Sequence, residues 1–171
     1  SNDLAIDLGM DDIFALAESR NESPFIVVCD SLEDPHNLGA ILRSAEAAGV
    51  HGVIIPKRNS VTLNYTVAKT SAGAIEYVPV VKVANLPAAI DELKSRGVWI
   101  FGADMDGTDY TALDYSGSIA LVIGSEGKGI GRLVREKCDF IASLPMRGKI
   151  NSLNASVAAG ILMFEAAKHR N

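Results

Sequence analysis

Arg43 is the first side chain in the sequence whose surroundings suit chemistry. It follows Asn37 and Gly39 in the segment Asp30-Ser-Leu-Glu-Asp-Pro-His-Asn-Leu-Gly-Ala-Ile-Leu-Arg43, and Asn37 is expected to cap the helix that carries it. A guanidinium group stays protonated at any usual pH, so it can hold a phosphate or stabilise a developing oxyanion. An arginine there is often only a solvated surface residue. The small residues Gly39 and Ala47 on its face indicate a close neighbour and favour a functional role.

A second segment, Gly124-Ser-Glu126-Gly127-Lys-Gly-Ile-Gly131, places four glycines within eight positions. Such turns let a cofactor approach the backbone and can direct N–H groups at an anion. The spacing matches neither the dinucleotide-binding nor the P-loop fingerprint, which disfavours those ligand classes. A flexible connection would explain the glycines, but it leaves the carboxylate of Glu126 without a purpose.

A third segment runs from Leu144-Pro-Met146 to Ser152-Leu-Asn154 and into the small residues of 155–160. Ser152 or Asn154 is expected to cap the last helix, and the small residues allow tight helix packing. A buried helix interface would explain these residues by itself, and Met146 is more often core than ligand contact.

All three segments follow apolar strands, and the elements around them alternate. Short, continuously apolar strands separated by helices predict an α/β fold, with a mostly parallel sheet covered by helices on both faces. Ligands of such sheets bind at the carboxyl ends of the strands, where the three segments lie. The expected strands are 25–29, 52–56, 77–81, 98–103, 119–124 and 140–145, and the expected helices are 11–19, 38–48, 64–72, 86–96, 132–138 and 154–168.

The composition is that of one folded domain, whose compact part we expect to begin near Phe25. With 171 residues, 48% apolar and 22% charged, the chain can bury a core without disulfides or metal. Residues 104–118 are expected to form the longest irregular stretch, and His51 and His169 are expected at the surface.

Charge, cysteine use and hydropathy limit the partners. The net charge of −5 argues against broad attraction to phosphates, so RNA must meet a local patch or another domain. No apolar run suits a membrane span, and the first residues lack a secretory pattern. Cys29 and Cys138 are expected to be reduced thiols, with no zinc-binding cluster. We therefore expect a cytoplasmic protein without a membrane partner.

Together the three segments resemble the motifs of the SpoU (TrmH-like) RNA methyltransferases of the SPOUT superfamily. Their order and positions match, and the resemblance extends from about Phe25 to the end of the chain. Within the family it is closest to the large-subunit rRNA guanosine 2′-O-methyltransferases. The residues that carry it are Asp34, Pro35, Asn37, Gly39, Arg43, Ile123, Gly124, Glu126, Gly127, Leu144, Pro145, Met146, Ser152, Leu153, Asn154 and Ser156.

The resemblance implies a C-terminal deep trefoil knot, a homodimer, and S-adenosylmethionine as a cofactor bound in the knot, with no metal. Residues 1–24 would be the end of an interdomain linker whose N-terminal RNA-binding domain is absent from this chain, and 25–171 would form the catalytic domain. The cofactor would lie against residues of three loops, namely Gly102, Ala103, Leu121, Ile123, Gly124, Gly127, Leu144, Met146, Ser152 and Leu153.

The reaction that the resemblance implies is methylation of a ribose 2′-hydroxyl in RNA. A guanosine of large-subunit rRNA is the first expectation, and a tRNA guanosine is the alternative. Arg43 usually has the catalytic role in this family, and we expect it to hold the target phosphate or stabilise the alkoxide. Asn37, Glu126 and Asn154 would orient Arg43 and the substrate.

His36 is the rival base, because a histidine titrates near neutrality. The cations of the second and third segments either form a patch for RNA phosphates or only solubilise the surface. These cations are Lys128, Arg132, Arg147 and Lys149.

Two other classes of function remain. A catalytically idle RNA-binding relative would leave the polar residues Asn37, Arg43, Glu126 and Asn154 without a purpose. An oxidoreductase with a nucleotide cofactor would need a phosphate-binding glycine fingerprint after the first strand, and the sequence has none there.

Overall fold

The computed structural model describes residues 8–57 and 63–170. In this part of the chain six strands form one sheet in the order β3-β2-β1-β5-β4-β6, and every neighbouring pair is parallel. The strands are β1 (Phe25–Cys29), β2 (Gly52–Pro56), β3 (Val80–Val83), β4 (Trp99–Asp109), β5 (Ile119–Ile123) and β6 (Phe140–Ser143). The helices are α1 (Met10–Ser19), α2 (Pro35–Ala48), α3 (Tyr65–Thr70), α4 (Leu86–Ser95), α5 (Arg132–Lys137) and α6 (Ala155–Ala167), with short 3-10 turns η1 (Ala74–Glu76) and η2 (Tyr110–Ala112).

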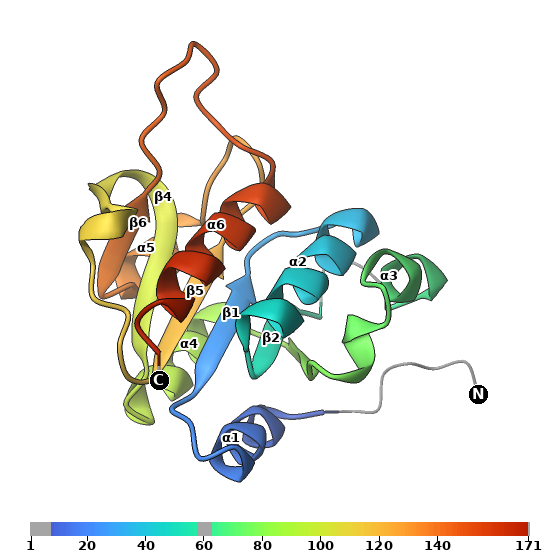
Figure 1. Cartoon of the computed structure of the whole chain (residues 1–171). Coiled ribbons are helices and arrows are strands. Elements are labelled where there is room, and N and C mark those ends of the chain that lie inside the picture. The colour runs from blue at the N-terminus through green and yellow to red at the C-terminus, as the bar shows by residue number, and fades with distance from the viewer. Residues whose placement is uncertain (1–7, 58–62, 171) are drawn as a thin grey trace.

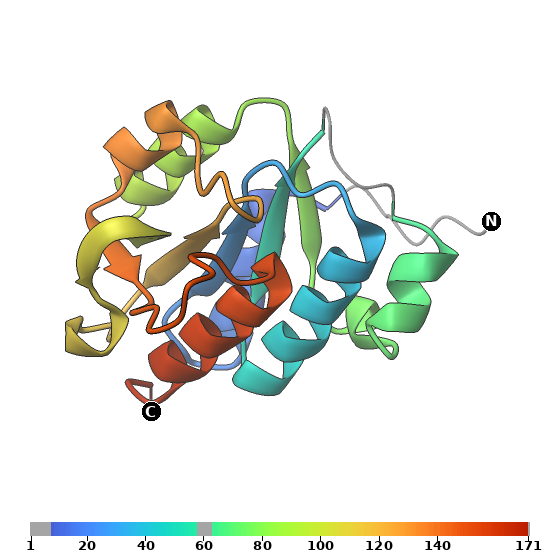
Figure 2. The ribbon, with the colours of Figure 1, turned by 90° about the horizontal axis from the view of Figure 1, so that it is seen from above.

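Helices cover both faces of this sheet, as the sequence predicts (Figures 1 and 2). Alternate residues of a strand point to opposite faces. In β1, Phe25, Val27 and Cys29 therefore join the core beneath α2, α3 and α6. Ile26 and Val28 join the second core beneath α1, α4 and α5. Both layers are apolar, which explains why the strands read as unbroken apolar runs.

The predicted elements all exist, and several bounds differ. β1 and β2 match the expected 25–29 and 52–56, whereas β3 begins at Val80 and not at residue 77. The reason is local: the 3-10 turn η1 ends at Glu76, and Tyr77 is its C-terminal cap, so the chain is not yet extended there. Within the described residues, no helix has the length and apolar character to cross a bilayer.

The irregular stretch expected at 104–118 is partly strand. β4 continues to Asp109 and pairs with β6 a second time, at Thr108 and Asp109, after residues 104–107 leave the ladder. The expectation of one long loop was wrong because it ignored a bulge, in which a strand departs from its partner and rejoins it.

Helix α2 begins earlier than expected, and its cap is Asp34 rather than Asn37. The Asp34 carboxylate accepts a hydrogen bond from the His36 amide at 2.8 Å, and Pro35 occupies the first turn. Proline suits that position because its missing N–H has no partner there. Asn37 therefore lies in the first turn of the helix and is not its cap.

Compact structure begins at α1, before the expected Phe25. Met10, Ile13 and Ala17 of α1 are buried, and Ile13 lies against Gly52, where a Cβ would come within 2.4 Å of its side chain. Arg96 places its guanidinium over the Phe14 ring at 4.5 Å and pairs with Asp11. That residues 1–24 end an interdomain linker stays a prediction.

His51, expected at the surface, is fully buried. Its Nδ1 accepts a hydrogen bond from the Phe25 amide at 2.9 Å, and its Nε2 lies 2.8 Å from the Glu22 carboxylate. Since Nδ1 must be an acceptor, the ring is neutral with its proton on Nε2. This pair ties the segment before β1 to the start of β2.

Protonation of His51 should destabilise the fold. Burial lowers the pKa of His51 below its ordinary 6.5. As the pH falls below 6.5, the unfolded chain therefore binds a proton at this residue before the folded chain does, and the folded state loses stability. We expect the free energy of unfolding in urea to fall between pH 7.5 and 5.5. His51→Asn keeps an acceptor for Phe25 and cannot titrate. This variant should be less stable by about 1–3 kcal/mol at pH 7.5 and lose less on acidification. An equal loss in both proteins would show that His51 is not the cause.

Candidate functional site

A cavity of about 470 Å³ opens at the carboxyl ends of β4, β5 and β6. Its size suits a ligand of nucleoside dimensions. Its wall combines apolar side chains with a few polar ones and much exposed backbone. The lining residues come from three stretches of chain, at 103–106, 123–129 and 142–158. Two of the three segments singled out in the sequence therefore meet in one place.

The glycine-rich segment forms a tight turn on one side of the cavity. The Gly129 amide donates to the Ser125 carbonyl at 3.1 Å, and the two residues form an isolated antiparallel bridge. A Cβ at Gly124 would lie 2.0 Å from the Gly129 carbonyl oxygen, so no side chain fits there. Gly127 and Gly129 have φ values of 80° and 67°, in the left-handed region that favours glycine.

Two carboxylates outside the turn hold it in position. Asp30, directly after β1, accepts a hydrogen bond from the Gly131 amide at 2.8 Å. Asp104 approaches the turn from β4, and a Cβ at Gly129 would meet its Oδ1 at 2.6 Å. Arg135 of α5 pairs with Asp104 at 2.7 Å and donates to the Met105 carbonyl at 3.2 Å.

The bulge of β4 forms a second side of the cavity. The Ser143 hydroxyl donates to the Asp104 carbonyl at 2.6 Å and accepts from the Gly107 amide at 2.8 Å. These bonds satisfy backbone groups that the interrupted ladder leaves without partners. A Cβ at Gly107 would meet the Ile141 carbonyl oxygen at 2.4 Å, so the close return of the strand also requires glycine.

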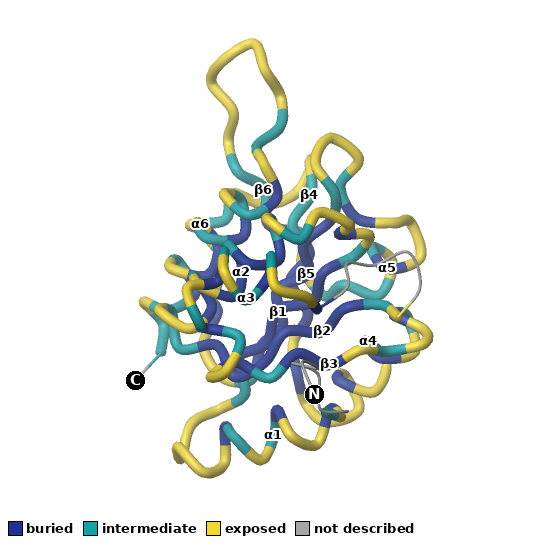
Figure 3. Tube along the Cα trace, turned by 90° about the vertical axis from the view of Figure 1, so that its right-hand side faces the viewer, coloured by how far each residue is buried: buried dark blue, intermediate teal, exposed yellow. Residues whose placement is uncertain are grey.

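The third side is the connection from β6 to α6, which projects beyond the body of the molecule (Figures 1 and 3). Asn154 caps α6, as predicted, by accepting hydrogen bonds from the Ser156 amide at 2.9 Å and the Ser156 hydroxyl at 2.5 Å. Leu144, Ser152 and Leu153 line the cavity near the base of this connection. The trefoil knot that the family resemblance implies would involve the threading of this segment past the glycine turn. That threading stays a prediction.

Most residues expected to hold a cofactor lie together on the cavity wall. Gly102 and Leu121 do not line it. Leu121 is fully buried in the core beneath α2 and α6, and a Cβ at Gly102 would meet the Cys138 sulfur at 2.6 Å. The eight that line the cavity are Ala103, Ile123, Gly124, Gly127, Leu144, Met146, Ser152 and Leu153.

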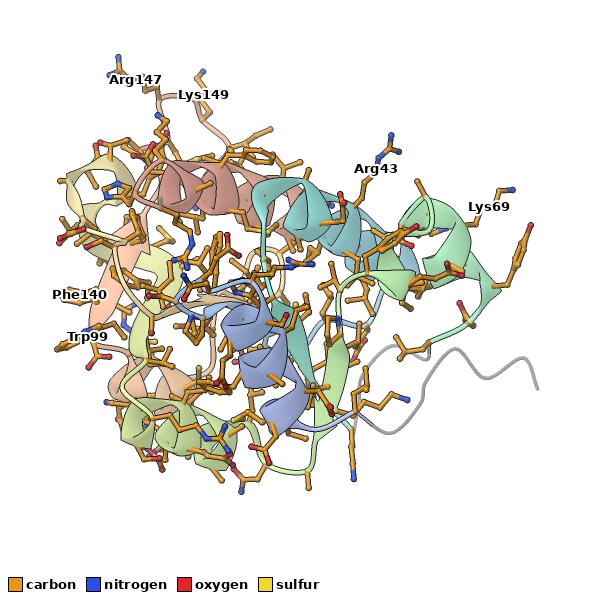
Figure 4. The ribbon with its side chains drawn as sticks, turned by 60° about the horizontal axis from the view of Figure 1, so that its bottom comes forward. Arg43, Lys69, Trp99, Phe140, Arg147 and Lys149 are labelled. Carbon is orange, nitrogen blue, oxygen red and sulfur yellow. The ribbon has the colours of Figure 1, made fainter. Side chains whose placement is uncertain are left out.

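The four residues expected to be catalytic are not gathered around one atom. Glu126 lines the cavity and is exposed, and Asn154 adjoins it as the cap of α6. Arg43 is exposed on α2 and extends outward, between Lys69 and the projecting residues Arg147 and Lys149 (Figure 4). Asn37 is half-buried in the first turns of α2 and does not line the cavity.

The rival base His36 lies on the face of α2 that carries Arg43. It is exposed and stands seven positions earlier, which is two helical turns or about 10.5 Å along the axis. The two side chains therefore start two turns apart on that face. Both side chains can still face the same extended ligand.

Sequence reasoning missed the acidic residues of the β4 bulge. Asp104 and Asp106 line the cavity together with Met105, in the stretch 104–118 that the sequence predicts to be irregular. Their position directly after an apolar strand was the available signal, since strand ends form the ligand edge of a parallel sheet. Asn151 and Ser143 were also missed.

Neither cysteine belongs to the cavity wall. Cys29 is fully buried, and burial raises the pKa of its thiol to about 12. Burial likewise raises the pKa of Cys138 to about 11. Both thiols are thus protonated at neutral pH and act as apolar packing groups. The described residues contain no cluster of three or more His, Cys, Asp or Glu that could hold a metal ion.

Comparison with known proteins identifies the relatives of this chain. The profile of the SpoU rRNA Methylase family matches residues 24–164. YacO of Bacillus subtilis, assigned to the TrmH family of tRNA/rRNA methyltransferases, is 56% identical over 163 residues. That alignment covers 95% of this chain and 66% of YacO.

Solved structures give the same result. The SpoU methyltransferase AviRb from Streptomyces viridochromogenes, crystallised with AdoMet, superimposes with a TM-score of 0.80 at 30% identity, over 86% of this chain and 60% of that one. An AdoMet-bound rRNA methyltransferase from Sinorhizobium meliloti gives 0.79 at 31% identity, over 86% and 57%. This chain therefore spans less than two thirds of the length of each of these relatives.

Gly124 should be the least replaceable residue of the turn. Gly124→Ala places a methyl group against the Gly129 carbonyl, and we expect a loss of about 1–3 kcal/mol in the free energy of unfolding. Gly148→Ala is the matched control, because Gly148 lines the same cavity and a Cβ there meets nothing within 4 Å. Denaturant unfolding of both variants measures the difference. Equal stability of the two would mean that the turn relaxes freely.

Proposed function

This chain belongs to the SpoU rRNA Methylase family, and we propose that it transfers a methyl group from S-adenosylmethionine to a ribose 2′-hydroxyl of RNA. The observation that carries the proposal is the cavity, whose wall joins the glycine turn, the β4 bulge and the base of the last connection. Two relatives of the same fold were crystallised with AdoMet, which supports the same ligand here. We propose a guanosine of large-subunit rRNA as the substrate, with tRNA as the alternative.

The cavity wall fits an adenosyl group. Leu144, Leu153 and Ile123 offer apolar surface to the faces of a purine, and the glycine turn lets backbone amides and carbonyls reach its edge. The exposed carboxylate of Glu126 would add negative charge to the cavity wall, which favours a cationic sulfonium ligand. Bound S-adenosylmethionine supplies an electrophilic methyl group, and methyl transfer requires no metal.

Arg43 is proposed to act on the RNA rather than on the cofactor. It is exposed on α2, outside the cavity lining. A guanidinium cannot readily accept a proton, so Arg43 would bind the phosphate beside the target ribose and stabilise charge that develops on the 2′-oxygen. Alignment of the hydroxyl with the methyl donor then supplies much of the rate.

The cations around the cavity mouth are proposed to bind RNA phosphates. Arg147 and Lys149 extend from the projecting connection (Figure 4), and Lys128 lies on the cavity wall. Arg132 is exposed as well, although it pairs loosely with Glu136 at 3.6 Å. These residues would form a local cationic patch on an acidic protein, as RNA binding requires.

We also propose a homodimer that acts in the cytoplasm. The outer face of α6 is apolar: Val157, Ile161 and Phe164 recur at helical spacing and are 49%, 36% and 49% exposed. A helix that is apolar on both faces needs a partner for its outer side. Two protonated, packed thiols agree with a reducing compartment.

Cofactor binding should depend on Leu153. Leu153→Asp puts a carboxylate into the apolar cavity wall. Burying that charge under a ligand costs about 1.4 kcal/mol or more, which is a factor of ten in affinity. We therefore expect calorimetric titration to show at least tenfold weaker binding of S-adenosylhomocysteine. Ile150→Asp is the matched control, since Ile150 is 77% exposed on the same connection and outside the cavity lining. A folded parent that binds no S-adenosylhomocysteine would contradict the proposed activity.

Arg43 should matter for catalysis and not for cofactor affinity. We expect Arg43→Ala to lower kcat about 10²–10³-fold on unmodified large-subunit rRNA, with unchanged S-adenosylhomocysteine binding. Transfer of a labelled methyl group to transcribed rRNA measures this, and Arg20→Ala, an exposed arginine at the end of α1, is the control.

The same assay separates the alternatives. Turnover on transcribed tRNA and not on rRNA would select the tRNA substrate. A parent that binds S-adenosylhomocysteine and RNA but methylates neither RNA would support the idle relative. Full activity of Arg43→Ala would remove Arg43 from the mechanism.

A further inference from the structure

Helix α3 presents an aromatic ring and a cation on one face. Tyr65 and Lys69 are four positions apart, so they are neighbours on the helix surface, with about 5–6 Å between their Cβ atoms. Tyr65 is 76% exposed, and Lys69 is exposed too. Val67, on the inner face, is fully buried and anchors the helix to the core. The core therefore does not use the outer face of α3.

The position of α3 is fixed against α2 by a close contact. A Cβ at Gly39 would lie 1.7 Å from the Thr70 hydroxyl oxygen, so the two helices approach as closely as a glycine allows. The Thr70 hydroxyl donates to the Thr66 carbonyl at 2.7 Å, so its proton is already used within α3. Gly39 stands one turn before Arg43, so the contact also sets the distance between Arg43 and the face of α3.

The cations of this region are not neutralised by neighbouring carboxylates. In the described ranges, no ion pair involves Arg43 or Lys69, whereas Lys94, Arg96 and Lys137 on the opposite face of the sheet are paired. Asp34 accepts a hydrogen bond as the cap of α2. Glu46 stands three positions after Arg43 and is its neighbour on the helix surface, but the two form no ion pair. Figure 4 shows Arg147, Lys149, Arg43 and Lys69 in succession along one side of the molecule.

An exposed tyrosine beside a lysine suits an unpaired nucleotide. Unstacked bases lie flat on aromatic rings, and this contact accepts any base because each has a π face. The ammonium group binds the adjoining phosphate without regard to sequence. Bases within a duplex are stacked already and cannot use such a ring.

We propose that the α3 face of Tyr65 and Lys69 binds an unpaired nucleotide next to the methylation site, so that the RNA runs from the cavity mouth past Arg43 to α3. The inference rests on the proposed function and extends it, because it names single-stranded RNA as the form in which the substrate is held. Tyr65 stacks on the base, and Lys69 binds the phosphate.

The test is fluorescence anisotropy of a labelled, mixed-sequence 12-nucleotide RNA, as a single strand and annealed to its complement. We expect Tyr65→Ala to weaken binding of the single strand at least about fivefold and to leave duplex binding unchanged. Lys69→Ala should weaken both and reduce the salt dependence of binding by about one counterion. Tyr77→Ala and Lys168→Ala, an exposed aromatic ring before β3 and an exposed lysine after α6, should change neither.

Calorimetry with S-adenosylhomocysteine on every variant separates the two proposals. If the parent does not bind S-adenosylhomocysteine, the proposed methyl transfer is overturned, and the anisotropy result alone decides the α3 inference. Normal S-adenosylhomocysteine binding with unchanged single-strand affinity in Tyr65→Ala would overturn the α3 inference alone. A parent that does not bind the single strand would overturn it as well, and an equal loss on duplex would show that Tyr65 does not stack on a base.

Discussion

The site depends on one steric constraint: after β5 the chain turns back so tightly that Gly124 lies against Gly129. Gly124 faces the Gly129 carbonyl at a distance that no side chain allows, and the turn between them forms a wall of the cavity. The hydrogen bond from Gly131 to Asp30 and the contact of Gly129 with Asp104 hold this segment from β1 and β4, the two strands that flank β5. Arg135 of α5 in turn holds Asp104, so two strands and a helix fix one short loop. A cavity bounded by backbone needs such support, because backbone without side chains has little packing of its own.

The parallel sheet accounts for where these parts meet. Because all six strands run in the same direction, the segments after β1, β4, β5 and β6 emerge at one edge. The burial of both faces leaves that edge as the place where polar residues can gather. The same topology puts Arg43 on the helix after β1, beside the cavity and not inside it. An arrangement of this kind suits a large substrate that contacts both the cavity mouth and the neighbouring helices.

Much of the fold could be predicted from the sequence, because apolar runs such as 25–29 and 119–123 have few alternatives to buried parallel strands. The failures were local. The cap at Asp34 competed with Asn37, and only geometry shows that Pro35 already begins the helix. The bulge at 104–107 depends on Ser143, which is distant in the sequence. His51 resembles a surface histidine until its two partners, Phe25 and Glu22, are in place. Family resemblance indicated ten cofactor-binding residues, and eight of them line the cavity. Their contact with a cofactor remains a proposal, as do the roles of Arg43, Asn37, Glu126 and Asn154.

We propose that the three walls of this cavity together hold the adenosyl group. Backbone hydrogen exchange with and without saturating S-adenosylhomocysteine tests it most directly, since exchange reports each segment separately. We expect added protection at 103–107, 123–131 and 142–154, and little change in α1 or α4. Binding that instead protects the start of α2 and the loop before it, or that leaves the glycine turn unprotected, would show that the adenosyl group is not held in this cavity.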